Sequence, residues 1–412
     1  MLPSSSVGTS ETTATNAPRR AVGLEDPFGP EVLSNPLPFQ ERLREAGSVV
    51  LLEKYGVYAL GRYDTVRSAL LDWQSFESSA GVGISNFRTE KPWRPPSLLL
   101  EADPPHHDAP RAVLSGILGP RALRELEPRW RADADALVDE VLARGSEFDA
   151  AAELAAAFPL RVFPDAVGIQ DAGREHLLPY GDHLLNSFGP ENFLVQRGAP
   201  TVADHAGWVN EQCARHMLEP GGFGAQIWAA ADRGELSETQ APLIVRSLLS
   251  AGVDTTVHGI GAILHAFASH PDAWEELRAE PALARVAFDE AIRLESPVQT
   301  FFRTTTTDIE VDGTLIPEGH KILMFLGSAN RDPRHWAHPD TFDLRRDPSG
   351  HLGFGMGIHQ CVGQHVARLE ATAIITALAK RVRTLELAAE PTRHLNNTMR
   401  AWETLPVRVE LA

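Results

Sequence analysis

The stretch 351-HLGFGMGIHQCVGQHVARLEATAIITALAKRV-382 decides the fold class of this chain. Three glycines precede Cys361 and Gly363 follows it, so the backbone around the cysteine must bend tightly or approach something flat and bulky. An amphipathic helix follows, which places Cys361 near a helix N-terminus, where free N–H groups and the helix dipole stabilise a thiolate. A thiolate held in this way can ligate iron.

On its own, a single cysteine in a glycine-rich turn is more often an inert buried thiol than a metal ligand. Here four residues form a Phe-x-x-Gly-x-x-x-Cys-x-Gly pattern without a gap: Phe354, Gly357, Cys361 and Gly363. The pattern resembles the haem-binding loop of the cytochrome P450 superfamily, whose cysteine is the axial ligand of the iron. The resemblance implies haem b as the cofactor, with Cys361 as the metal ligand and Phe354 and Gly355 beside the haem.

Two further segments stand in the order that this superfamily shows. Glu290 and Arg293 lie three residues apart on a predicted helix, and alone they could be just a local ion pair. The stretch 329-ANRDPRHWAHPDTFDLRR-346 then supplies Arg-Asp-Pro and Phe-Asp. A buried carboxylate and guanidinium need further hydrogen-bond partners. The resemblance implies that this stretch provides them for a structural Glu290–Arg293 pair.

The remaining patterns favour a mainly α protein with a small β-rich lobe. Helical periodicity dominates residues 120–290. Hairpins are predicted at 48-SVVLLEKYGVYALGRY-63 and from Met399 to Leu411, and short strands with Asp-Gly and Pro-Glu-Gly turns at 307–326. The resemblance implies the cytochrome P450 fold, a triangular prism with the haem between a long central helix and the cysteine-loop helix.

Length and composition set the domain organisation and exclude several classes of function. The 412 residues are 43% hydrophobic and can bury a large core. Residues 1–20, rich in Ser, Thr and Ala, are expected to be a disordered tail, which leaves 21–412 as a single catalytic domain. The net charge of −17 argues against nucleic-acid binding.

The cellular location is predicted from what the chain lacks. Two cysteines are too few for a disulfide framework, which fits a reducing cytoplasm. No run reaches the ~20 apolar residues of a membrane span, and the N-terminus lacks a signal-peptide pattern. We therefore expect a soluble, cytoplasmic enzyme that binds no membrane.

A capping box predicts a long central helix over residues 237–269. Inside it, 251-AGVDTT-256 contains several poor helix formers, which indicates a local cost tolerated for function. The alternative is that Thr and Asp simply bond to helix carbonyls. The stretch resembles the oxygen-binding signature of the superfamily, and this implies catalytic roles for Thr255, as hydrogen-bond partner of dioxygen, and for Asp254, as a proton relay.

Haem carries two propionates that need cationic partners. The resemblance implies four candidates for this contact: His107, Arg111, Arg303 and His351. His359 stands where many bacterial members carry His or Arg. Relatives commonly show His-Thr-Arg in the first stretch, whereas here Asp108 and Ala109 follow His107. The added carboxylate weakens the positive potential expected at a redox-partner surface.

A carboxylate-binding site is predicted at one end of the substrate pocket. Ser247 lies about 12 Å along the predicted helix from Thr255, a gap that a small ring could span. Arg246 adjoins Ser247, and the loop 91-KPWRPPSLLLEADPP-105 supplies one further Arg and one further Ser. Two serines and two arginines could clamp a carboxylate, although each alone is more often a helix or turn hydroxyl or a surface charge.

Four stretches carry a closer resemblance: KPWRPPSLLLEADPP, VRSLLSAGVDTT, ESPVQTFFRTTT and LMFLGSANRDPR. They look like the bacterial subfamily that oxidises para-substituted benzoates, notably by demethylating 4-methoxybenzoate, and the likeness runs from about residue 26 to the C-terminus. It implies carboxylate binding by Arg94, Ser97 and Ser247 with support from Arg246. The ring would pack against Phe188 and Phe301, with Ala251 on the same helix face as Ser247.

The implied reaction is O-demethylation of 4-methoxybenzoate to 4-hydroxybenzoate with release of formaldehyde, consuming O₂ and two electrons. The sequence contains no flavin or nicotinamide motif, so we expect a separate ferredoxin and an NADH-dependent ferredoxin reductase as partners. The alternatives are a peroxide-using haem-thiolate enzyme, an isomerase, and a non-catalytic haem sensor or carrier. The Asp254–Thr255 pair argues against all of them.

Overall fold

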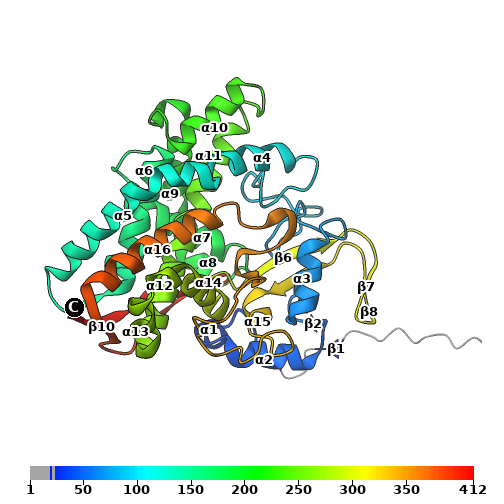
Figure 1. Cartoon of the computed structure of the whole chain (residues 1–412). Helices are drawn as coiled ribbons and strands as arrows, with labels where there is room; N and C mark the ends of the chain where they lie inside the picture. Colours follow the sequence, from blue (N-terminus) through cyan, green and yellow to red (C-terminus); the bar gives the residue numbers. More distant parts are fainter. Residues whose placement is uncertain (1–18, 21–23) are drawn as a thin grey trace, which may run out of the picture.

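The computed structural model describes residues 19–20 and 24–412, and Figure 1 shows their arrangement. The tail predicted over 1–20 lies outside the described residues, except for the last two, which form a short strand. The helices are α1 (Pro30–Ser34), α2 (Leu37–Ala46), α3 (Tyr63–Leu71), α4 (Asp108–Ile117), α5 (Pro120–Leu142), α6 (Ala157–Val167), α7 (Leu177–Asn186), α8 (Phe193–Gly198), α9 (Val202–Gln212), α10 (Phe223–Asp232), α11 (Ala241–Ala251), α12 (Asp254–Ser269), α13 (Pro271–Ala279), α14 (Ala284–Glu295), α15 (Leu326–Ala329) and α16 (Gln364–Arg381).

The strands gather mainly on one side of the molecule, to the right in Figure 1. They are β1 (Arg19–Arg20), β2 (Val50–Leu52), β3 (Val57–Leu60), β4 (Phe76–Glu77), β5 (Glu147–Asp149), β6 (Thr300–Thr305), β7 (Ile309–Val311), β8 (Thr314–Ile316), β9 (Lys321–Phe325), β10 (Val382–Leu387), β11 (Thr392–Leu395), β12 (Arg400–Thr404) and β13 (Pro406–Leu411). The largest sheet has the order β1-β2-β3-β9-β6-β4. This is the predicted small β-rich lobe beside a mainly helical body.

The hairpin predicted at 48–63 and the Asp-Gly turn predicted within 307–326 are confirmed. β2 and β3 pair antiparallel with Val50 opposite Ala59. β7 and β8 are joined through Asp312 and Gly313, which both have positive φ (48° and 77°), as a tight hairpin turn requires.

The hairpin predicted from Met399 to Leu411 is wrong. β12 pairs with β11, whereas β13 pairs with β10 and β5. Only Leu405 separates β12 from β13, which is too short for a hairpin turn. The N–H of Leu405 donates to the Asp149 carboxylate (2.8 Å) and its carbonyl accepts from Ala150 (2.8 Å), so the chain runs on from one sheet into the next.

The prediction of one continuous central helix over residues 237–269 is also wrong. The capping box forms, with the Ser237 N–H 2.8 Å from the Gln240 side-chain oxygen, but α11 ends at Ala251 and α12 starts at Asp254. Threonine hydroxyls occupy the carbonyls at the break: Thr255 Oγ1 donates to Ala251 O (2.8 Å) and Thr256 Oγ1 donates to Gly252 O (3.2 Å). Such bonds compete with the helix ladder.

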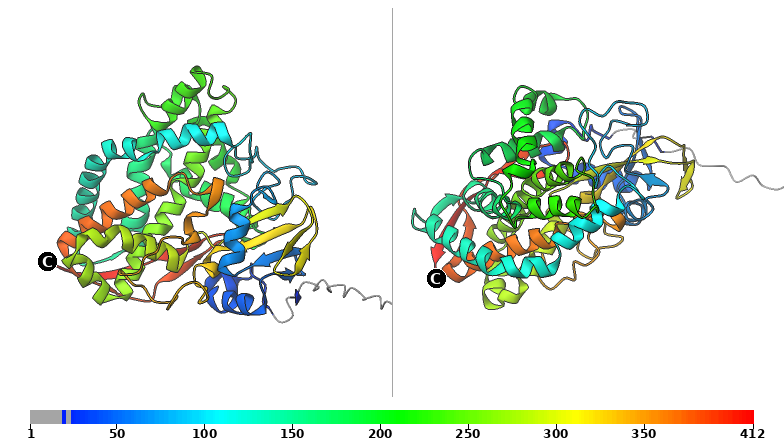
Figure 2. Two further views of the ribbon diagram at one scale, coloured as in Figure 1. Left: turned by 45° about the vertical axis from the view of Figure 1, so that its right-hand side comes forward. Right: turned by 90° about the horizontal axis from the view of Figure 1, so that it is seen from above.

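α12 is the core helix of the molecule, buried on nearly all sides. It contacts α14, α16 and β10. A Cβ at Gly259 would stand 3.2 Å from Ile292 of α14, so glycine allows these two helices to approach closely. α5 and α16 run side by side in both views of Figure 2.

A fully buried ion pair connects the helical body to the segment before the cysteine loop. Arg293 Nε lies 2.7 Å from Glu290 Oε2, Nη2 lies 2.9 Å from Oε1, and both side chains are 0% exposed. Arg346 Nε adds a bond of 2.9 Å to Glu290. The remaining Arg293 N–H groups donate to carbonyls of Asn330, Pro339 and Thr341. The predicted partners from 329–346 are therefore present.

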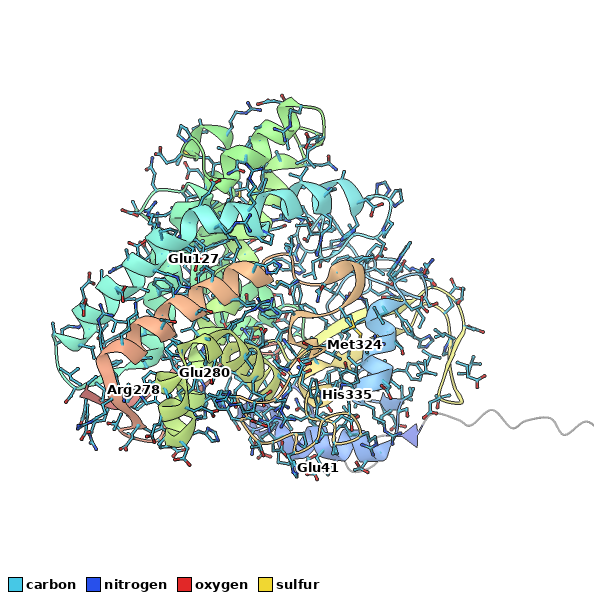
Figure 3. All side chains as sticks on the ribbon, viewed as in Figure 1. Glu41, Glu127, Arg278, Glu280, Met324 and His335 are labelled. Carbon is cyan, nitrogen blue, oxygen red and sulfur yellow. The ribbon has the colours of Figure 1, made fainter. Side chains whose placement is uncertain are left out.

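Figure 3 shows where one residue of this segment lies relative to the helices. His335, within 329–346, lies on the side of Met324 in β9, whereas Arg278 and Glu280 lie among the helices on the other side.

We expect Arg293→Met to cost about 3–5 kcal/mol of unfolding free energy, because it leaves the Glu290 carboxylate buried without its main partner. Denaturant unfolding followed by far-UV circular dichroism measures the loss. Arg215→Met, which breaks an ion pair whose side chains are 50% and 55% exposed, is the control and should change stability little. Equal effects of the two substitutions would contradict a stabilising role for the buried pair.

Candidate active site

A cavity lies between the α11–α12 junction and the cysteine loop. It brings together residues that are far apart in the chain, and its lining includes most of the predicted site residues: Arg94, Ser97, Arg111, Phe188, Arg246, Ser247, Ala251, Thr255, Phe301, Arg303, Phe354, Gly355 and Cys361. Among the described residues, no Asp or Glu lines it. A cavity with four arginines and no carboxylate in its wall suits anionic groups.

The cysteine loop is held in a tight turn below this cavity. The Cys361 N–H donates to Phe354 O at 2.8 Å. Gly357 has φ 72°, and a Cβ there would stand 2.7 Å from Leu70 O, so only glycine fits. Burial raises the pKa of the Cys361 thiol, while the backbone N–H groups of Gly363 and Gln364 oppose the rise. These N–H groups point at the sulfur as a bound thiolate requires.

The residues around Cys361 fit a haem. Arg111 and Arg303 line the same cavity as the cysteine and provide cationic groups for propionates. His359 also lines it, but its two ring nitrogens are already bonded to Leu99 O and to Asp103 (3.1 Å each). Burial lowers the pKa of Arg303 to about 10, which leaves it charged near neutral pH. His107 lies beside His359, with ring centroids 4.9 Å apart, and its Nε2 is buried without a hydrogen-bond partner. An unsatisfied buried nitrogen at this place is explained by a group that binds there.

Three predicted site residues do not line the cavity: Asp254, His107 and His351. His351 Nδ1 accepts the Gly353 N–H (3.2 Å), and its Nε2 lies 4.0 Å from Asp289 Oδ1. Burial lowers the pKa of His351 to about 3, so it is neutral in this arrangement. Its contact with a propionate stays a prediction.

Asp254 points away from the cavity, into a buried layer between α12 and α7. Its Oδ2 has no hydrogen-bond partner, and a Cβ at Gly181 of α7 would stand 2.5 Å from it. His258 Nε2 lies 3.8 Å from Asp254 Oδ1. Burial raises the pKa of Asp254 to about 8 and lowers that of His258 to about 4. Near neutral pH the carboxyl group therefore holds a proton, one residue away from Thr255.

A charged histidine lies close to this buried carboxyl group. His394 Nε2 is 2.7 Å from Asp182 Oδ1, and Nδ1 is 2.6 Å from the partly exposed Glu403. The hydrogen bond to Asp182 is the main reason that the pKa of His394 rises to about 9. Sequence patterns gave no indication of this cluster, because α7 and the β11–β12 hairpin are more than 200 residues apart in sequence.

The four side chains predicted to bind a carboxylate line another part of the cavity: Arg94, Ser97, Arg246 and Ser247. Ser97 Oγ and Ser247 Oγ lie 3.4 Å apart, although 150 residues separate them in the chain. Arg246 Nη2 donates to Pro95 O (2.8 Å), which ties α11 to the proline-stiffened loop. Arg94 also points here, but its Nη1 lies 2.9 Å from Glu101 Oε2.

Sequence reasoning missed Glu101, although a signal was present. Glu101 follows Ser97 by four residues, and the Glu101 N–H bonds to Ser97 O (3.1 Å) in a single helical turn. A carboxylate at that spacing returns to the start of the turn, and Glu101 Oε2 accepts the Ser97 N–H at 2.8 Å. Its side chain is 2% exposed.

Comparison with known proteins decides the family. A family model described as "Cytochrome P450" matches residues 225–408. "Cytochrome p450 CYP199A2" of Rhodopseudomonas palustris is 55% identical over 384 residues, which cover 93% of each chain. This chain belongs to the cytochrome P450 family. "Cytochrome P450 107B1" of Saccharopolyspora erythraea is 33% identical and covers 85% of this chain and 89% of its own.

Solved structures agree with this assignment. "Cytochrome P450 CREJ in complex with (4-ethylphenyl) dihydrogen phosphate" superposes with a TM-score of 0.84 at 26% identity, covering 93% of this chain and 99% of its own. P450BioI in complex with an acyl carrier protein gives a TM-score of 0.82 at 27% identity, covering 92% and 100%. The predicted fold and enzyme class are confirmed: the chain is a haem-thiolate monooxygenase of the family that uses haem b. Among the described residues, no helix is long and apolar enough to cross a membrane.

The His394 cluster predicts a pH-dependent part of the stability. Because the folded pKa of about 9 exceeds the ordinary value of 6.5, the contribution is fully present below pH 6.5 and is lost as the pH rises through 9. The shift corresponds to about 3 kcal/mol. We expect His394→Asn to destabilise the protein at pH 6 by this order and much less at pH 10, measured by denaturant unfolding. His106→Asn, at an exposed position outside the cluster, is the control. A pH-independent difference would contradict the assignment.

Proposed function

We propose that this cytochrome P450 oxidises para-substituted benzoates, and that it O-demethylates 4-methoxybenzoate to 4-hydroxybenzoate and formaldehyde. The observation that carries the proposal is the clamp, in which two arginines and two serines from α11 and the 91–105 loop converge on the cavity that also contains Cys361. The sequence resemblance to the benzoate-oxidising subfamily supports the same substrate.

The charge of the clamp matches a benzoate. Arg94 and Arg246 contribute two positive charges, and Glu101 removes one through its ion pair with Arg94. A net charge of one remains for a singly charged carboxylate. The Ser97 hydroxyl accepts from the N–H groups of Leu99 and Leu100 and can donate to the ligand, whereas the Ser247 hydroxyl donates to Leu243 O (3.0 Å) and would have to rotate toward it.

The middle of the cavity suits an aromatic ring. Phe188 and Phe301 line it with ring centroids 6.1 Å apart. Leucines surround them: Leu99, Leu100, Leu184, Leu185 and Leu248. Ser247 of α11 and Thr255 of α12 lie on either side of the helix break, and both line the cavity. A benzoate held at Ser247 would therefore direct its para substituent toward Thr255 and Cys361.

Haem b, when bound through Cys361, supplies the reductive activation of O₂ that inserts one oxygen atom into the methoxy C–H bond and releases the other as water. Two electrons and two protons balance the reaction, and the resulting hemiacetal breaks down to the phenol and formaldehyde. A separate ferredoxin with its NADH-dependent reductase would supply the electrons. Thr255 is the hydroxyl nearest in sequence to the buried proton store at Asp254, and we assign these two residues to proton delivery.

Loss of the carboxylate should weaken binding. In a spectral titration of the haem-loaded enzyme, 4-methoxytoluene should bind about 10–100 times more weakly than 4-methoxybenzoate, because the arginines lose a charge-assisted partner. The low-to-high-spin shift of the haem reports binding of both compounds. Equal affinities would contradict the clamp.

Thr255→Ala should keep haem binding and substrate affinity but uncouple the reaction. We expect the fraction of consumed NADH recovered as 4-hydroxybenzoate to fall several-fold while hydrogen peroxide rises, because proton delivery loses its hydroxyl. Thr255→Ser, which retains the hydroxyl, is the matched control. Unchanged coupling in the alanine variant would remove Thr255 from this role.

A further inference from the structure

Glu101 lies immediately behind the wall of the clamp. It does not line the cavity, and its side chain is 2% exposed, yet Oε2 accepts from both Arg94 Nη1 (2.9 Å) and the Ser97 N–H (2.8 Å). It is therefore bonded to two of the residues assigned to the carboxylate. Burying a carboxylate here costs free energy that a neutral side chain would not cost.

The other charges near Glu101 do not replace its effect. Lys321 interacts with Glu101 electrostatically, but burial lowers its pKa to about 7, its nitrogen donates to Ala80 O (2.9 Å) and Gly81 O (2.7 Å), and it does not line the cavity. Arg111 and Arg303 belong to the haem end. At the clamp itself the formal sum is two arginines less one glutamate.

We propose that Glu101 sets the charge selectivity of the clamp, so that the enzyme accepts a singly charged head group and rejects a doubly charged one. This inference rests on the proposed function, because it assumes that the clamp binds an aromatic anion. A fixed negative charge behind Arg94 opposes each added negative charge of a ligand, so the penalty for a dianion is twice that for a monoanion.

A purely structural role for Glu101 makes a different prediction. If the carboxylate only holds the turn that carries Ser97, its loss should weaken all ligands alike. If it sets the charge, its loss should favour the dianion over the monoanion. The ratio of the two affinities therefore separates the roles.

The test uses Glu101→Gln, which keeps an oxygen acceptor for Arg94 and the Ser97 N–H but removes the charge. Two tetrahedral probes of matched length are titrated into the haem-loaded enzyme at pH 8.5 by the spin-state shift: 4-methoxybenzenesulfonate with one negative charge and 4-methoxyphenylphosphonate with two. In the unmodified enzyme the sulfonate should bind more tightly. In Glu101→Gln the ratio of affinities should move toward the phosphonate by at least tenfold.

Two control variants accompany this measurement. Glu90→Gln removes one charge from an exposed position that does not line the cavity, where solvent screens it, and should leave the ratio unchanged. Glu101→Asp keeps the charge and should also keep the ratio, even where the shorter side chain weakens both probes.

The outcomes are distinct. A tenfold shift in Glu101→Gln alone supports the proposal. An unchanged ratio, or failure of both probes to bind either enzyme, overturns it, since shape rather than charge would then select the ligand. 4-Methoxybenzoate is titrated in parallel: if it binds, only the role of Glu101 has failed, and if it does not, the proposed function has failed with it.

Discussion

The buried pair between Glu290 and Arg293 is the constraint on which the rest of the structure depends. Burying two ions away from water costs more free energy than their mutual attraction provides, unless every remaining donor and lone pair is hydrogen-bonded. Here the additional hydrogen-bond partners come from outside α14: Arg346 and three backbone carbonyls. The pair is therefore stable only when the 329–346 segment is in place. That segment leads directly into the cysteine loop, so the ligand cysteine is fixed from the helical body.

At the opposite wall of the cavity, the break in the central helix also depends on hydrogen bonds from side chains. Two threonine hydroxyls bond to carbonyls at Ala251 and Gly252, which a regular helix would use for its own N–H groups. A Cβ at Gly252 would stand 2.4 Å from Phe163, so the local conformation also depends on glycine. α12 then starts at Asp254, whose side chain turns into the layer against α7 while Thr255 faces the cavity. The two residues are consecutive in α12, and at 3.6 residues per turn consecutive side chains point about 100° apart, so they face different sides of the helix.

The sequence predicted those features whose cause is local or carried by a motif. The cysteine loop, the Glu290–Arg293 spacing and the Asp-Gly turn at 312–313 all encode their geometry in adjacent residues. The misplaced C-terminal hairpin shows the limit, because the partners of β12 and β13 are chosen by sheets formed elsewhere in the chain. The same holds for the Asp182–His394 pair, which joins residues 212 positions apart. Alternation and spacing along one segment contain no information about such contacts.

The electrostatics of the cavity depend on two features: its wall contains no described carboxylate, and one carboxylate, Glu101, lies behind the wall. No acidic residue lines the described wall, so the haem end and the clamp end are both positive. Without a nearby negative charge, the arginines at both ends of the cavity would bind any anion. Glu101 changes this at the clamp end alone, because it is bonded to Arg94 from behind and leaves the wall itself free of negative charge. A carboxylate one layer deeper reduces the field without competing for the hydroxyls of Ser97 and Ser247. The position of that one side chain therefore distinguishes a general anion pocket from a site for a single negative charge.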